Sequence, residues 1–136
     1  MTGCAVWIEH HQGQITQASR AACAAAQKLD LPITAWVIGP LSVAEQVVRW
    51  PNVSAVRHGH EAEVLWSIEH KAQWCLAQCG ALSHVVAASS SEVNGLWPRV
   101  AACVSAPMVT DVKQILDQHT FQRLMYAGQV KVKVQV

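Results

Sequence analysis

Short apolar runs alternate with longer segments of helical periodicity along most of the chain. The runs predict five strands, at residues 4–8, 33–38, 53–57, 84–88 and 107–112. The first run shows no alternation of apolar and polar positions, which is typical of a strand buried on both faces of a parallel sheet. Helical segments separate the runs, so their order predicts β–α–β units and an α/β fold.

The intervening segments predict four helices, at residues 17–29, 41–49, 61–78 and 96–104. Thr16 suits the N-cap of the first helix, and Gly80 suits the C-terminal stop of the third. Pro98 fits the fourth helix because proline is tolerated in a first turn. The apolar face of the first helix is expected at Ala18, Ala21, Ala22, Ala25 and Leu29, and that of the third at Leu65, Ile68, Ala72, Cys75, Leu76 and Cys79.

The pattern changes near the C-terminus, where two strand-like runs follow each other closely. They cover residues 120–125 and 129–136 and flank Tyr126-Ala127-Gly128, which predicts a β-hairpin. In the second run the valines share one face and Lys131 and Lys133 the other, which indicates a solvated or edge strand.

The composition is that of one globular domain that is poor in charge. The chain has 136 residues, 51% of them hydrophobic and 14% charged, and its net charge is +1. A disordered segment would be poorer in apolar residues and richer in net charge, and this balance predicts no binding of nucleic acid. Because polar cover is scarce, we expect part of the surface to be buried by a partner or by self-association.

The sequence predicts neither membrane insertion nor secretion. No apolar run approaches the ~18 residues of a membrane-spanning helix, and the N-terminal stretch lacks the basic start of a signal peptide. The five cysteines are odd in number and form no CxxC pair. Reduced thiols, and therefore a cytoplasmic location, explain this pattern better than a disulfide framework does.

Glycine spacing excludes the common phosphate-binding loops. The seven glycines lie at least ten positions apart, whereas GxGxxG and GxxxxGK[ST] need closely spaced glycines. Weaker candidates for cofactor binding follow predicted strands, because open α/β sheets hold ligands at the carboxyl ends of their strands. These candidates are Glu9, His10, Ser90 and Ser91. The serines fit a second interpretation better, in which they only cap the turn into the next helix.

Neither a metal site nor a catalytic centre is expected. His58 and His60 share one side of an extended segment, but structural zinc usually needs four ligands. Cys75 and Cys79 lie on a predicted apolar helix face, where core packing explains them better. No GxSxG motif and no activated cysteine predicts a nucleophile.

Six tryptophans are many for a chain of this length. Trp7 and Trp36 fall in predicted buried strands. Trp50, Trp66 and Trp97 lie at helix ends or off the apolar face, where tryptophan either anchors an interface or covers the domain's own core. We expect the surface near Trp66, Trp97 or the terminal hairpin to be the part that a partner buries.

A series of motifs from residue 90 onward has a recognisable order. It consists of Ser90-Ser91, a helix around Leu96-Trp97-Pro98-Arg99, a run Ala106-Pro107-Met108-Val109-Thr110-Asp111, and a hairpin with Phe121-Gln122-Arg123 and Tyr126-Ala127-Gly128. This order and spacing resembles the N-terminal domain of the electron transfer flavoprotein α subunit. The start Val6-Trp7-Ile8-Glu9-His10 agrees with it, so the resemblance spans nearly the whole chain.

The resemblance implies a three-layer α/β domain with a mostly parallel sheet, Rossmann-like and of the adenine-nucleotide-hydrolase type, ending in a β-hairpin. It implies that residues 1–136 form a single scaffold domain and that the C-terminal domain that binds FAD is absent. In this family a flavin carries electrons from dehydrogenases to an acceptor, the partner is a β subunit, and AMP sits in that β subunit. The chain itself is then expected to be an electron-carrier domain without catalytic residues.

The same resemblance gives six motif residues structural or interface roles. From the residues themselves, Arg99 of the Pro98-Arg99 pair is expected to pair with Asp111 in a structural role, which we favour over the alternative of ligand binding. Arg123 and Tyr126 are expected to contact a neighbouring domain, and Gly128 is expected to adopt a positive φ in the hairpin turn. Val93-Asn94 and Gln129 depart from the usual family residues and indicate a diverged relative. The alternative function is a stand-alone nucleotide-binding module that uses the loops around Glu9-His10 and Ser89-Ser91.

Overall fold

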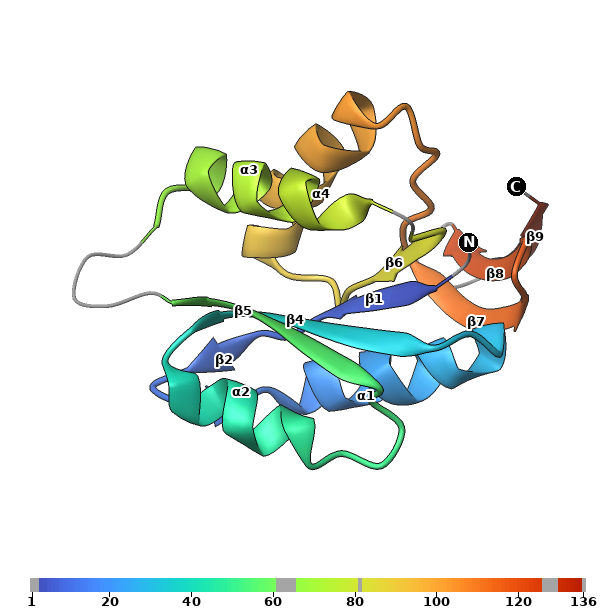
Figure 1. The fold of residues 1–136 in the computed structure, drawn as a ribbon. Helices are drawn as coiled ribbons and strands as arrows, with labels where there is room; N and C mark the ends of the chain where they lie inside the picture. The colour runs from blue at the N-terminus through green and yellow to red at the C-terminus, as the bar shows by residue number, and fades with distance from the viewer. Residues whose placement is uncertain (1–2, 61–65, 81, 126–129, 136) are drawn as a thin grey trace.

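Four parallel strands form the central sheet of the computed structural model, which describes residues 3–60, 66–80, 82–125 and 130–135. They are β1 (Cys4–Trp7), β4 (Ile33–Gly39), β5 (Ala55–His60) and β6 (His84–Val86), in the order β5-β4-β1-β6 (Figure 1). The register pairs Cys4 with both Ile33 and His84. The α/β fold class and these four predicted strands are confirmed, although β5 continues to His60, beyond its predicted end.

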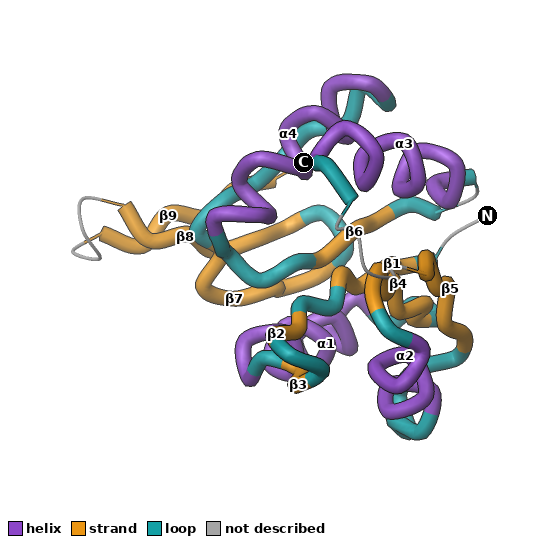
Figure 2. Tube along the Cα trace, turned by 90° about the vertical axis from the view of Figure 1, so that its left-hand side faces the viewer, coloured by secondary structure: helices purple, strands orange, loops and turns teal. Residues whose placement is uncertain are grey.

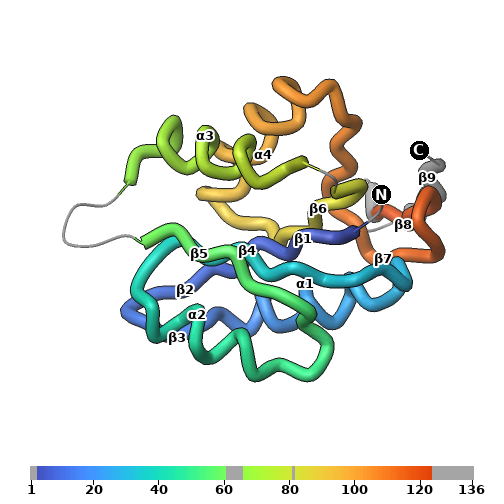
Figure 3. The backbone as a smooth tube through the Cα atoms, in the orientation of Figure 1, coloured from blue at the N-terminus to red at the C-terminus, as the bar shows by residue number. Residues whose placement is uncertain are grey.

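Helices cover both faces of this sheet and make a three-layer domain (Figures 1 and 3). The helices α1 (Gln17–Ala26), which runs on into a 3₁₀ turn (Gln27–Leu29), and α2 (Leu41–Val48) lie on one face. The helices α3 (Ile68–Cys79) and α4 (Ser91–Cys103) lie on the other. No helix in the described parts of the chain has both the length and the apolar character that a membrane span requires.

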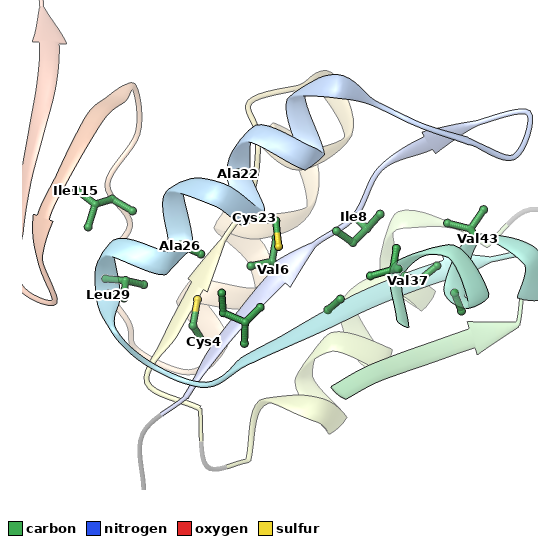
Figure 4. Close-up of a cluster of buried hydrophobic side chains, with 14 residues drawn as sticks. Cys4, Val6, Ile8, Ala22, Cys23, Ala26, Leu29, Val37, Val43 and Ile115 are labelled. Carbon is green, nitrogen blue, oxygen red and sulfur yellow. The ribbon is translucent and has the colours of Figure 1, made fainter. Parts of the chain in front are cut away.

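Strand residues alternate between two hydrophobic cores. Cys4, Val6 and Ile8 point into the core beneath α1 and α2 (Figure 4). Ala5 and Trp7, between them in sequence, point into the core beneath α3 and α4. Because both faces of β1 are buried, its sequence reads as a continuous apolar run.

The C-terminal part forms a second, antiparallel sheet (Figure 2). Its strands are β7 (Val112–Asp117), β8 (Thr120–Met125) and β9 (Val130–Gln135), in the order β7-β8-β9. The predicted pair of β8 and β9 is confirmed, and β9 is an edge strand among those described. The predicted strand at 107–112 is wrong, because residues 104–111 form turns and loop and the strand begins only at Val112. Tyr126 and Gly128 lie outside the described residues.

Two of the predicted helices begin elsewhere in the structure. Helix α3 begins at Ile68, with the Ser67 hydroxyl capping the amide of His70 at 3.1 Å. Helix α4 begins at Ser91, so Pro98 lies inside the helix rather than in its first turn. The third difference is the buried face of α1, which consists of Ser19, Ala22, Cys23 and Ala26 with Leu29 beyond. Thr16 is the N-cap of α1, as predicted.

Candidate functional site

Glu9 and Ser90 meet at the carboxyl edge of the parallel sheet. Glu9 follows β1 and Ser90 follows β6, and these strands are neighbours, so the chain returns to the same edge after 81 residues. The Ser90 hydroxyl donates a hydrogen bond to the Glu9 carboxylate. The same hydroxyl accepts from the amide of Val93 at 3.1 Å, which makes Ser90 the N-cap of α4.

The hydroxyl of Ser19 holds Glu9 from the other side. This serine is fully buried in the first turn of α1 and accepts a hydrogen bond from the backbone amide of Glu9 at 2.8 Å. The Thr16 hydroxyl in turn donates to Ser19 at 3.0 Å. The backbone at Glu9 is therefore fixed by α1 while its carboxylate faces the start of α4.

Two histidines bind the end of β4 at the same edge. Nε2 of His10 donates to the carbonyl oxygen of Ile38 at 2.8 Å, and Nε2 of His58 donates to that of Gly39 at 2.7 Å. His10 belongs to an unpredicted two-stranded hairpin, β2 (His10–His11) with β3 (Gln14–Ile15). Its ring packs so closely on Gly39 that a Cβ there would overlap it.

At this edge of the sheet, a carboxylate of the chain itself lies where a phosphate group would bind. A helix N-terminus attracts negative charge, and at α4 the Glu9 carboxylate already lies beside the capping serine. A second anion would be repelled, so the described residues here do not fit the phosphates of a flavin or an adenine nucleotide. Ser91 is exposed in the first turn of α4, and neither its side chain nor that of His10 takes part in the contact of Glu9 with Ser90.

Four tryptophans form a continuous cluster in the core beneath α3 and α4. The ring centroids of Trp97 lie 5.7 Å from Trp7 and 5.9 Å from Trp36, and Trp74 lies 5.8 Å from Trp36. The buried Nε1 atoms of Trp7, Trp36 and Trp97 have no hydrogen-bond partner in the part of the chain that the structure describes. Trp97 therefore packs in the domain's own core, and the expectation that it marks a partner surface is wrong. Trp66 is half-buried and stacks on His70 with centroids 3.9 Å apart.

Arg99, one of the family-motif residues, has a partner other than the one expected. Arg99 binds Glu69 of α3 at 2.8 Å rather than Asp111, and this hydrogen bond holds the pKa of the Glu69 carboxyl below its usual value. Asp111 has a φ of 55°, and its Oδ2 lies 3.9 Å from Nη2 of Arg123. The Arg123 guanidinium also donates to the carbonyl oxygen of Thr110 at 2.7 Å, so it fastens the loop before β7.

The cysteines and histidines form no metal cluster within the described residues, since no three potential ligands gather there. Burial raises the pKa of the Cys75 thiol to about 12, with the neighbouring Cys79 as a smaller cause. Cys75 is therefore a neutral core residue near physiological pH, as the apolar face of its helix suggested.

The fold defines a class of protein: a three-layer α/β domain with a mostly parallel sheet and antiparallel strands at its C-terminus. The comparison with family models is more specific. The chain belongs to the electron transfer flavoprotein domain family, whose model matches residues 4–136. It is the N-terminal domain of an α subunit in that family, according to its relatives.

Three relatives illustrate the match, and each is named as an electron transfer flavoprotein α subunit or a probable one. The mitochondrial protein of Oryza sativa subsp. indica is 42% identical over 67 residues, which is 49% of this chain and 16% of that protein. The probable α subunit of Saccharomyces cerevisiae is 33% identical, over 87% of this chain and 37% of that protein. The Pseudomonas aeruginosa α subunit is 27% identical, over 96% and 43% respectively. The chain thus spans less than half the length of these relatives.

Proposed function

We propose that this chain is the docking scaffold of an electron transfer flavoprotein α subunit and holds no flavin itself. In this proposal it binds a β subunit, which contains AMP, while FAD occupies a separate domain of the α subunit. The assembly passes electrons from dehydrogenases through the flavin to an acceptor. The chain contributes position and surface, and it catalyses no reaction of its own.

Exposed apolar side chains on one continuous segment support a docking role. Val104, Met108, Val112 and Leu116 are 46%, 40%, 38% and 42% exposed. They lie on the connection from α4 to β7 and on β7 itself, along the side of the domain where the small sheet lies (Figure 1). Apolar surface of this kind is typical of a protein interface.

The carboxyl edge supports the absence of flavin from this domain. Glu9 lies at the N-terminus of α4 and His10 fills the space beside Gly39. Both contacts are made by the chain's own side chains. The rival function, a stand-alone nucleotide-binding module, would need the same edge for an anionic ligand.

Reduced thiols in the cytoplasm remain part of the proposal. All five cysteines are free in the structure, and Cys4, Cys23 and Cys75 are buried. Bacterial and mitochondrial α subunits are both among the relatives, so fractionation of the source cells is the direct test.

Binding of a β subunit tests the docking role. The chain is co-expressed with the electron transfer flavoprotein β subunit of the same genome, and the affinity is measured by titration calorimetry. Leu116→Glu and Met108→Glu should weaken binding at least about tenfold, because a charge would be buried in an apolar interface. Val48→Glu is the matched control, since Val48 is 60% exposed on α2, outside the proposed docking segment.

Three results would contradict the proposal. The first is equal binding by all three variants. The second is flavin that stays with the purified chain through gel filtration. The third is a thermal shift of several degrees with AMP or ATP that saturates at micromolar concentration, which would favour the nucleotide-binding module.

A further inference from the structure

A cleft of about 270 Å³ opens between α1 and the turn that follows α2. It belongs to the layer opposite α3 and α4 and contains none of the residues of the proposed docking segment. Its walls are formed by one face of α1 and by the turn, namely by Arg20, Cys23, Ala24, Gln27, Trp50, Pro51 and Asn52.

Arg20 provides a positioned positive charge at this cleft. Its guanidinium lies 5.1 Å from the centroid of the Trp50 ring, a cation–π distance. No carboxylate in the described parts of the chain lies within ion-pair distance of Arg20. The guanidinium is thus held in place by a ring, which leaves its planar set of N–H donors available for an oxyanion.

The floor of the cleft is neutral. Cys23 is almost fully buried, and the Asn52 side-chain amide donates a hydrogen bond to its sulfur at 3.3 Å. Burial raises the pKa of the Cys23 thiol, so no thiolate forms there near neutral pH. Asn52 is held against α1 by this contact, and it fixes the turn relative to the helix.

Among the described residues, the lining combines donors with apolar carbon and contains no acidic side chain. Arg20 and Ala24 share one face of α1, because residues four apart share a helix face. Gln27 extends this side of the cleft at the start of the 3₁₀ turn. Trp50 and Pro51 form the apolar wall opposite. The space of about 270 Å³ lies just below the roughly 300–1,000 Å³ typical of sites for drug-sized ligands, so it suits a small ligand.

We propose that this cleft binds a small carboxylate with a planar apolar body, whose carboxylate pairs with Arg20 and whose body lies against Trp50 and Ala24. Planar guanidinium and carboxylate groups form paired hydrogen bonds, which neither a lysine nor an amide can reproduce. This site is independent of flavin and of the β subunit.

Benzoate is the probe, and benzamide is its neutral counterpart of the same shape. Binding to the 136-residue chain is followed by the ¹H–¹⁵N signal of the Trp50 indole, assigned with Trp50→Phe. Benzoate should shift this signal in a saturable manner, and benzamide should bind at least about tenfold more weakly. Arg20→Gln should weaken benzoate by a similar factor.

Lys28→Gln is the matched control, since Lys28 is an exposed cation on the 3₁₀ turn outside the lining. This variant should bind benzoate as the unaltered chain does. Arg20 is exposed, so circular dichroism of Arg20→Gln should show a retained fold.

Equal affinity for benzoate and benzamide, or unchanged binding by Arg20→Gln, would overturn the proposal. So would the absence of any saturable shift. A shift produced by an acidic peptide and not by benzoate would replace the small ligand with a protein segment, and this outcome also overturns the site as proposed.

Discussion

Replacing Gly39 by alanine tests whether the carboxyl edge is as tightly closed as its contacts indicate. Gly39 ends β4 with a φ of 153°, a conformation that residues with a side chain rarely adopt. The added Cβ would lie 2.6 Å from Cε1 of His10 and closer still to its Nε2. The imidazole would have to move, and its hydrogen bond to the carbonyl oxygen of Ile38 would be lost.

The expected destabilisation has two parts. Backbone strain at such a φ costs of order 1–3 kcal/mol, and the lost hydrogen bond costs roughly 0.5–1.5 kcal/mol. Gly39→Ala should therefore lower the free energy of unfolding by about 2–4 kcal/mol. Gly13→Ala is the matched control, because Gly13 has a φ of 77° with no atom within 4 Å of the added Cβ. Gly13→Ala should show only the part of the destabilisation that comes from backbone strain.

Urea unfolding followed by tryptophan fluorescence measures both costs. In a His10→Ala background the added methyl group has room, so Gly39→Ala should cost about 0.5–1.5 kcal/mol less there than in the unaltered chain. An unchanged cost in that background would refute the contact between His10 and Gly39 as its cause. So would a Gly39→Ala variant no less stable than Gly13→Ala.

Buried thiols, the turn of the small sheet and an exposed ion pair give three smaller tests. Burial raises the pKa of Cys4 and Cys75 from 9.0 to about 12. The stability that these two buried thiols contribute in their neutral form is therefore complete below pH 9 and is lost between pH 9 and 12. At pH 10.5 unfolding should cost about 2 kcal/mol less per thiol, and Cys4→Ala, unlike the exposed Cys103→Ala, should reduce this loss in urea titrations. Gln118→Ala removes a 3.1 Å hydrogen bond to the end of the 3₁₀ turn and should speed amide exchange in β7. Arg99→Ala breaks an ion pair in which both side chains are more than half exposed. The free energy of unfolding measured in urea should therefore change by less than about 1 kcal/mol.

The parallel layer could be predicted because burial on both faces leaves a direct mark on the sequence. The strands β1 and β4 are almost entirely apolar, and both were predicted within a residue or two. The end of β5 was missed because His58 and His60 are polar. Their strand is extended by pairing with Val37 and Gly39, a contact between strands that periodicity does not record.

Helix α1 was found, but its buried face was not. Its alanines are spread around the helix, so several stripes fit the apolar pattern equally well. The face is chosen by Ser19, which counts as polar in a sequence yet is fully buried. Its hydroxyl is satisfied by Thr16 and by the amide of Glu9, and neither bond is visible without the fold.

The start of α4 was misplaced because a rule about proline was applied alone. Proline inside a helix costs about 3 kcal/mol or more, which favours a start near Leu96. In the structure Val93 in the first turn is buried with Leu96 and Val100 against the sheet. Ser90 caps this earlier start. Tertiary packing and capping therefore outweigh the local cost of Pro98.

The candidate edge could be located, but its contents could not be predicted. Neighbouring parallel strands place the residues after β1 and β6 at one edge, so Glu9 and Ser90 were both identified as candidates. Whether the side chains of Glu9 and Ser90 face a ligand or face each other is decided by side-chain direction. The contact between Arg99 and Glu69 was missed for the same reason, because it depends on how α3 and α4 pack.

The positions of the tryptophans change how the high apolar content of the chain is interpreted. Trp7, Trp36 and Trp97 lie almost fully within one core, so the tryptophans in that core do not need a partner to cover them. Exposed apolar side chains recur instead along residues 104–116, where Val104 and Leu116 are both more than 40% exposed, while Leu41 and Val48 are exposed on α2. This segment is anchored at its far end, because the backbone of Gln118 accepts a hydrogen bond from His84 of β6 at 2.7 Å. A partner that covers this segment would therefore meet a surface held to the parallel sheet, and its binding would need little ordering of the chain.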